Sequence, residues 1–244
     1  MASTNKNKEA IGIGRKSKKD SSLTTIGEVS DVSTAPTIPP DLTPYTIFLR
    51  CIKRAENLIN FHSSDANPNE EHFCDAYRAS IVLTIAALDA YARTVAIIKI
   101  KERIANKLKA KDPLRAYLKK IMTHDCLLES SLNDSFISEI EIQISNDFHQ
   151  KSFQGDEKIT EYFTLAGLSN IIGAVAAKQN KNEKTLKEEI NKYTKRRHTI
   201  AHNGDYATNQ VPYKELEIQK EFAENCHKLI SEFTKTLNEI CFKK

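Results

Sequence analysis

A basic stretch near the C-terminus holds the side chains best suited to chemistry: residues 195–205 read KRRHTIAHNGD. Arg197 and His202 stand there with four residues between them. A guanidinium can hold a phosphate group by two hydrogen bonds. An imidazole can take up and release a proton near neutral pH. A fixed cation beside a proton carrier therefore predicts chemistry at a phosphate.

A helical pattern that begins near Asn182 carries this stretch. Its apolar seam is spaced at steps of four, three, four and three residues, and consists of Leu186, Ile190, Tyr193, Arg197 and Ile200. A guanidinium in such a seam is costly unless it is paired or faces a wet cleft. Gly204 then supplies a helix stop.

The spacing of Arg197 and His202 raises a geometric problem. In a continuous helix the two side chains point about 140° apart, because each residue turns the chain by about 100°. Two alternatives stay open. Either the chain turns near Ala201, or the two side chains meet across a two-fold axis between two copies.

Other kinds of site have less support. His198 and His202 have the spacing of metal ligands on a helix, but Thr199 stands where a zinc peptidase needs its glutamate, and no third ligand is marked. There is no Gly-rich phosphate loop and no Gly-x-Ser-x-Gly motif. We therefore expect no metal and no cofactor.

The segment Arg-His-x-x-Ala-His-Asn-Gly over residues 197–204 resembles the Arg-x(4–6)-His signature of the HEPN superfamily. A second stretch, residues 78–91, is similar to the long second helix of that family, which often carries a Leu-acidic-Ala pattern. The resemblance runs from about Leu42 to the C-terminus, and the RiboL-PSP-HEPN branch is the candidate within the superfamily. It implies an all-α, HEPN-like helical bundle with a long second helix.

The resemblance also implies a metal-independent endoribonuclease that acts as a homodimer, with Arg197 and His202 as catalytic residues. Attack by an RNA 2′-hydroxyl on its own phosphate would leave a 2′,3′-cyclic phosphate. The family's biology implies a toxin or anti-phage defence effector, with an antitoxin or regulatory protein as a further partner. The alternative is a non-catalytic HEPN-type module that binds nucleotide or RNA or serves as a scaffold.

Neighbouring residues complete the predicted site. Arg196 lies off the apolar seam and is expected to contact phosphate, while His198 hydrogen-bonds or steers RNA or simply faces solvent. Asn203 is expected to support the site. Asp89 lies on or beside the apolar stripe of the long helix, where a carboxylate needs a cation. One interpretation is that it orients Arg197 or lines the site. The other is that it pairs with Arg93 four residues later or is satisfied at an ordinary helix contact.

Composition sets the domain boundaries. The chain has 244 residues and a net charge of +4, which permits a nucleic acid partner but does not demand one. We expect residues 1–41 to be a disordered tail containing a basic cluster at residues 15–19, and residues 42–244 to be one helical domain. An arm for RNA phosphates, or a targeting signal, is the alternative for that cluster.

The expected location is the cytoplasm. The five cysteines are odd in number and widely spaced, which is typical of reduced core thiols. The first residues lack the apolar core of a signal peptide. Residues 81–98 are apolar, but Asp89 and Arg93 interrupt them, which favours a buried helix over a membrane span.

Caps and periodicity predict the remaining elements. We expect helices that begin at Thr43-Pro44, near Glu70, at Asp112-Pro113, at Asn133-Asp134, at Asp156 and at Pro212. Residues 140–144 also fit a short strand. The helix from Asp156 is expected to continue through Val175.

Overall fold

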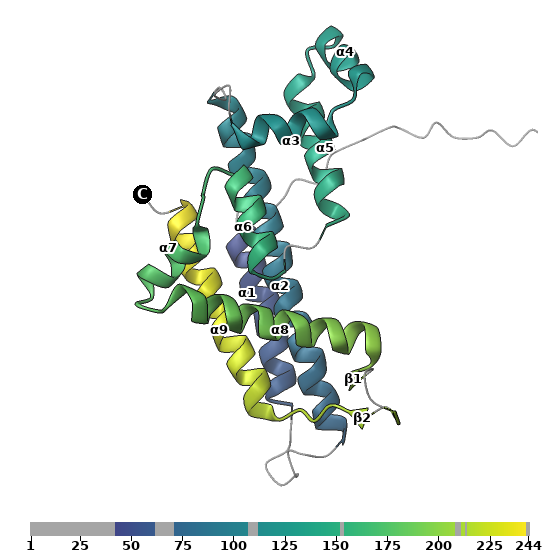
Figure 1. Cartoon of the computed structure of the whole chain (residues 1–244), viewed down its shortest axis with the longest axis vertical. Helices are drawn as coiled ribbons and strands as arrows, with labels where there is room; N and C mark the ends of the chain where they lie inside the picture. Colours follow the sequence, from purple (N-terminus) through teal and green to yellow (C-terminus); the bar gives the residue numbers. More distant parts are fainter. Residues whose placement is uncertain are drawn as a thin grey trace, which may run out of the picture. The chain divides into compact units, whose positions relative to one another are not determined.

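The computed structural model describes residues 42–61, 71–106, 112–151, 154–207, 211–212 and 214–242. Within these ranges the chain is all-α except for one short hairpin, and its elements are α1 Pro44–Ile59, α2 Glu71–Ala105, α3 Pro113–Ile121, α4 His124–Leu132, α5 Phe136–His149, α6 Asp156–Leu165, α7 Ile171–Lys178, α8 Glu183–Asn203, β1 Tyr206–Ala207, β2 Lys214–Glu215 and α9 Lys220–Phe242 (Figure 1). The tail predicted for residues 1–41 lies outside the described residues.

The second helix, α2, is long, as predicted, and it lies at the centre of the helical domain. Ile81, Ile85 and Leu88 are fully buried, and burying one such side chain contributes about 1.5–3 kcal/mol. Over Phe73–Ala105 the helix is long and apolar enough to cross a bilayer, but a core helix meets the same criteria. Here it packs against α1, α8 and α9.

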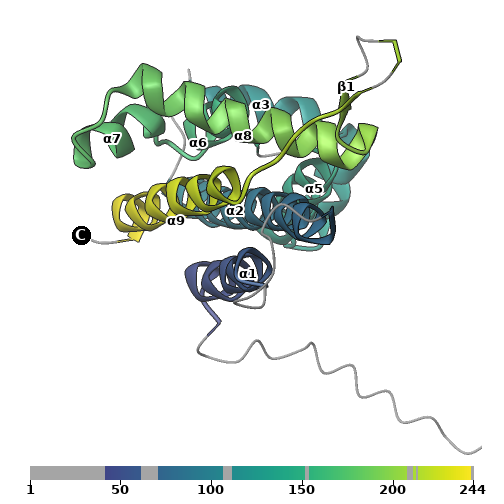
Figure 2. The ribbon, with the colours of Figure 1, turned by 90° about the horizontal axis from the view of Figure 1, so that it is seen from below.

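The helices lie in layers around α2. Seen end-on, α1 covers one side of the α2–α9 layer, and α6, α7 and α8 cover the other (Figure 2). Tyr91 on α2 joins the two lower layers, because its ring packs edge-on against Phe48 and its hydroxyl donates to Asn238 Oδ1 at 3.0 Å. Helix α8 therefore rests on a packed base, and its exposed face is left for other contacts.

Local sequence signals explain where several helices begin. Thr43 Oγ1 accepts a hydrogen bond from the Thr46 amide at 3.1 Å, and Asp112 Oδ1 accepts one from the Leu114 amide at 2.9 Å. Pro44 and Pro113 follow these caps as the first helical residues, where a missing amide hydrogen costs nothing. Both helix starts confirm the sequence prediction.

Two predicted elements were wrong in detail, and one helix was missed. The helix from Asp156 ends at Leu165, because Gly167 and Asn170 take left-handed backbone conformations before α7 begins. Pro212 begins no helix; the chain forms the β1–β2 hairpin instead, with Tyr206 opposite Glu215, and α9 begins at Lys220. Helix α4 was not predicted at all.

Residues 140–144 lie within α5, so the strand alternative is wrong. That helix begins at Phe136, two residues after Asp134, where its start was predicted. Ile140, Ile144 and Phe148 form its buried face at helical spacing.

Candidate functional site

Helix α8 carries the predicted site on its last turns. Asn182 Oδ1 caps its start by accepting from the Thr185 amide at 3.1 Å. Leu186, Ile190 and Tyr193 are its buried residues, as the seam predicted. The helix continues to Asn203 and ends at Gly204, whose φ of 58° is left-handed.

Because the helix continues through His202, the chain makes no turn near Ala201. His202 is five positions after Arg197 on the helix, which sets their side chains about 140° apart and about 7.5 Å apart along the axis. The first of the two geometric alternatives is therefore excluded. Within one copy the two side chains point to different sides of α8.

Arg197 is a half-buried cation without a carboxylate partner among the described residues. Its Nε is buried and has no hydrogen-bond partner there either. A buried donor left unpaired is costly, so it favours a site that gains an acceptor from outside the described chain.

Two imidazoles lie on the open side of the same turn. The rings of His198 and His202 are 4.4 Å apart between centroids and tilted by 42°, and both residues are exposed, as is Asn203. Two imidazoles alone do not make a protein metal site, which needs three or more ligands. In the described part of the chain no group of three His, Cys, Asp or Glu side chains is placed to hold a metal.

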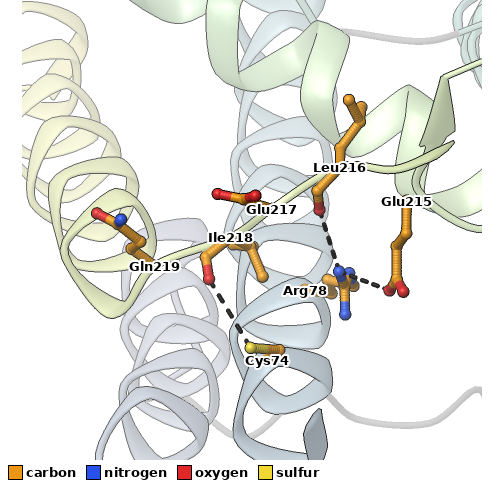
Figure 3. Close-up of a pocket in the computed structure, with 7 residues that line it drawn as sticks. All are labelled: Cys74, Arg78, Glu215, Leu216, Glu217, Ile218 and Gln219. Carbon is orange, nitrogen blue, oxygen red and sulfur yellow. Dashed lines mark hydrogen bonds and ion pairs between the residues drawn. The ribbon is translucent and has the colours of Figure 1, made fainter. Parts of the chain in front are cut away.

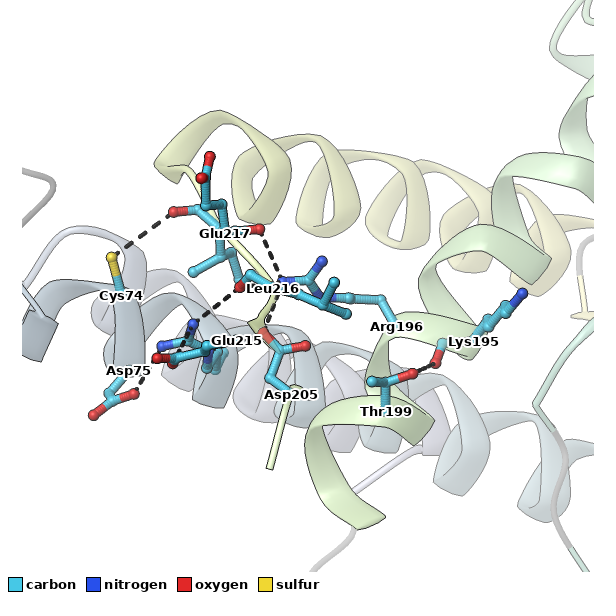
Figure 4. Close-up of polar contacts among 11 residues, drawn as sticks. Cys74, Asp75, Lys195, Arg196, Thr199, Asp205, Glu215, Leu216 and Glu217 are labelled. Atoms are coloured by element: carbon cyan, nitrogen blue, oxygen red, sulfur yellow. Dashed lines mark hydrogen bonds and ion pairs between the residues drawn. The ribbon is translucent and has the colours of Figure 1, made fainter. Parts of the chain in front are cut away.

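Arg196, the neighbour of Arg197, has several partners. Its Nη2 donates to Asp205 Oδ2 at 2.7 Å and to the carbonyl oxygens of Leu216 and Glu217 at 3.1 and 3.0 Å (Figure 4). These bonds tie the end of α8 to the segment that follows β2. That nitrogen is thus occupied, and a phosphate contact by Arg196 stays a prediction for the rest of its guanidinium.

Asp205 joins two arginines from distant parts of the chain. Its Oδ2 also accepts from Arg78 Nε at 2.9 Å, so a fully buried carboxylate lies between α2 and α8. Its backbone is held as well, since its amide donates to Thr199 O at 3.2 Å and its carbonyl accepts from the Leu216 amide at 2.9 Å. We call Arg78, Arg196 and Asp205 the Asp205 cluster.

Arg78 is the most heavily paired cation of this cluster. It also contacts Asp75 at 3.0 Å and Glu215 at 2.7 Å. Burial lowers the pKa of the Arg78 guanidinium, but the hydrogen bonds to Asp205 and Asp75 and the charge of Glu215 outweigh it, so the pKa lies above its ordinary value. Arg78 therefore stays charged and acts as a permanent counterion for Asp205.

A cavity of about 450 Å³ lies beside the Asp205 cluster, between the start of α2 and the segment after β2 (Figure 3). Its wall is closed by polar contacts, because Arg78 Nη2 donates to Leu216 O at 3.1 Å and Cys74 Sγ donates to Ile218 O at 3.8 Å. Arg197, His198 and His202 do not line it. The cavity thus offers only a guanidinium that already has carboxylate partners, and we do not assign the site to it.

Asp89 lies elsewhere. It forms an ion pair with Arg93 on its own helix, and Arg93 also donates to Lys151 O at 3.4 Å. Among the described residues no ion pair joins Asp89 to Arg197. Of the two alternatives for Asp89, the structure contains the pair with Arg93. A supporting role for Asp89 in the site stays a prediction.

Two residues of this region were missed as structural partners of the site. From the sequence, neither Asp205 nor Arg78 was predicted to form an ion pair at this site. A carboxylate directly after a glycine stop, beside a basic helix end, was the available signal for Asp205. Nothing in the local sequence pairs it with Arg78, because 127 residues separate them.

A comparison with known proteins identifies the family of the chain. The family model described as RiboL-PSP-HEPN matches residues 50–241, which is more than half of the chain and includes α2, α8 and the Asp205 cluster. No curated protein and no solved structure matches the chain. The chain, a HEPN-type helical domain, belongs to the RiboL-PSP-HEPN family.

Proposed function

We propose that this protein is a metal-independent endoribonuclease whose site is formed by Arg197 and His202 at the end of α8. The observation that carries the proposal is the state of Arg197. Its guanidinium has no carboxylate partner among the described residues, and it lies within about one turn of the exposed imidazoles of His198 and His202. A cation kept unpaired beside proton carriers suits an anionic substrate that reacts by proton transfer.

In the proposed reaction the RNA supplies its own nucleophile. A base takes the proton of a ribose 2′-hydroxyl, the 2′-oxygen bonds to the adjacent phosphorus, and the bond from phosphorus to the 5′-oxygen breaks. An acid returns a proton to that 5′-oxygen, and the products are a 2′,3′-cyclic phosphate and a 5′-hydroxyl. His202 carries the proton, and Arg197 stabilises the charge that grows on the phosphate oxygens.

The course of α8 supports a site shared by two copies. Since the two side chains diverge on one helix, they can act on one phosphate if Arg197 of one copy faces His202 of the other across a two-fold axis. His198 and Asn203 are exposed beside them and would contact RNA there. A role as toxin or anti-phage effector in the cytoplasm, held by an antitoxin, is part of the proposal and rests on the family alone.

The test is cleavage of total RNA by the purified protein in EDTA, with the product ends analysed. We expect the wild type to leave cyclic phosphate ends. His202→Ala and Arg197→Ala should each lose about 10²-fold or more of the rate, the range of general acid–base and electrostatic catalysis. Lys184→Ala is the matched control, because it removes an 85 % exposed cation from the far end of the same helix and should keep full activity.

Other results of this experiment would support a different function or mechanism. RNA binding that is lost in Arg197→Ala, without any cleavage by the wild type, would support the non-catalytic binding module. Cleavage by the wild type that EDTA abolishes would support a metal held by His198 and His202. Full activity of His202→Ala would contradict the proposed mechanism.

A further inference from the structure

Helix α4 buries none of its own leucines. Ser130 is its buried residue, while Leu128 and Leu132, one turn apart, are 63 % and 76 % exposed. The helix packs mainly on α5, to which Cys126 Sγ attaches it by donating to Glu139 Oε1 at 3.2 Å. A nine-residue helix without buried apolar side chains gains little from its own packing.

The exposed apolar surface continues onto the first turn of α5. It comprises large apolar side chains that are at least one-third exposed, namely Leu127, Leu128, Leu132, Phe136 and Ile137, and we call it the α4–α5 surface. Scattered exposed leucines are ordinary, but five exposed large apolar residues within residues 127–137 of one helical hairpin favour an interaction surface.

The helical hairpin that carries this surface has charges of one sign itself, although Lys119 and Lys120 precede it on α3, and Lys101 and Lys151 pair with Glu141 and Asp147 of α5. Residues 121–150 contain six carboxylates and neither lysine nor arginine, although the chain as a whole has a net charge of +4. Asp125, Glu129 and Asp134 are exposed and form no ion pair with any described residue. The apolar residues are therefore rimmed by uncompensated negative charge.

The negative charge indicates which kind of partner can bind to the α4–α5 surface. RNA would be repelled by the carboxylates. A second copy docked by the same surface across a two-fold axis would place these carboxylates against each other, which is unfavourable. An apolar stripe flanked by lysine or arginine complements both features of the surface. Such a stripe is what an amphipathic basic helix presents when it packs into a groove.

The surface is remote from the Arg197–His202 end of α8. Arg78, which pairs with Asp205, lies near the start of α2, and Arg103 near its end pairs with Asp112, the cap of α3. These two arginines are 25 helical residues apart, which is about 37 Å. Figure 1 likewise shows α4 and the hairpin at opposite ends of the view. A ligand on α4 would leave the end of α8 uncovered.

We propose that the α4–α5 surface docks an amphipathic helix of a different protein, one with leucine-like residues along one face and lysine or arginine beside them. Docking there attaches a partner without blocking the end of α8. The inference does not depend on the proposed ribonuclease activity, because it rests on burial and charge at the other end of the helical domain.

Two labelled model peptides and the full-length protein test this proposal. Both peptides are helices of about sixteen residues with leucine at i, i+3, i+4 and i+7, one with lysine and one with glutamate at the remaining positions. Fluorescence anisotropy should show binding of the leucine–lysine peptide only. Raising the salt from about 0.05 M to about 0.5 M should weaken that binding.

Variants assign the binding to the surface. Leu128→Ser with Leu132→Ser should weaken peptide binding by about tenfold or more, since each leucine loses its apolar burial. Asp125→Asn, Glu129→Gln and Asp134→Asn together should remove most of the salt dependence. Leu49→Ser is the matched control, because Leu49 is a 45 % exposed leucine on α1 and should have no effect. Thermal unfolding confirms that each variant is folded.

Several results would overturn the proposal. They are equal affinity for the leucine–glutamate peptide, or unchanged binding by the double serine variant. Loss of a dimer in sedimentation of the double serine variant would mean that a second copy occupies the surface instead.

Discussion

Arg196 and Arg197 are neighbours in sequence but have opposite surroundings. Arg196 donates to a buried carboxylate and two carbonyls, whereas Arg197 has no ion-pair partner among the described residues. One helix position, about 100° of rotation, separates the two cases. Arg196 can hold the end of α8 in place while Arg197 stays available to a substrate.

The Asp205 carboxylate should therefore contribute much of the local stability. Asp205→Asn leaves Arg78 and Arg196 without their shared counterion. We expect the free energy of unfolding to fall by about 3 kcal/mol, the low end of the cost of breaking a buried ion pair, because both arginines keep some contact with water. Urea denaturation measures this change.

Asp75→Asn provides the comparison for that experiment. Asp75 pairs with the same Arg78 but is 69 % exposed, so its loss should change the stability by less than about 1 kcal/mol. Equal losses in the two variants would mean that the Asp205 cluster has no special stabilising role. Hydrogen exchange at the amides of Asp205 and Leu216 should quicken in Asp205→Asn only.

At the scale of the element, the end of α8 depends on the left-handed backbone of Gly204. Gly204→Ala should lower stability by about 1–2 kcal/mol, the cost of that conformation for an L-residue. A Cβ there would lie 3.7 Å from the Tyr206 ring, an ordinary contact, so a clash adds nothing. Gly204→Asn should lose less, because asparagine tolerates this conformation. Urea denaturation measures both losses. Equal losses of stability in Gly204→Ala and Gly204→Asn would mean that the left-handed backbone is not their cause.

Elements with local signals could be predicted from the sequence. Thr43-Pro44, Asp112-Pro113, Asn182 and Gly204 each determine a helix end within a few residues, and all four are where the pattern placed them. The break between α6 and α7 could not be read in this way. It is held by Arg103, which donates to Leu165 O from 62 residues away and fills the space beside Gly167.

In the candidate site, too, local features could be predicted from the sequence and contacts between distant residues could not. The position of Arg197 in the seam of α8 followed from spacing alone, and the structure keeps Leu186, Ile190 and Tyr193 buried beside it. The Asp205 cluster depends on residues 78, 196 and 205 meeting in three dimensions, which periodicity does not report. Asp89, in contrast, forms an ion pair that local spacing did predict, with Arg93 four residues later.

At the scale of the whole molecule, the basic end of α8 and the acidic α4–α5 surface are separated. The cationic residues 195–197 belong to α8, which crosses the middle of the view in Figure 1, whereas α4 of the acidic α4–α5 surface lies at the top. A polyanionic substrate would be attracted to the first and repelled by the second. A protein partner and an RNA substrate could thus be bound together without competing for one surface.

A site shared between two copies makes a prediction about mixed dimers. Arg197→Ala and His202→Ala should each be inactive alone, but co-expressed they should recover about a quarter of the wild-type rate, because half of the dimers are mixed and each keeps one of its two Arg–His pairs. Arg197→Ala co-expressed with the Arg197→Ala/His202→Ala double variant is the control and should stay inactive, since no arginine remains. Sedimentation must show dimers in both mixtures. No recovery in the first mixture would mean that Arg197 and His202 do not act across the two-fold axis.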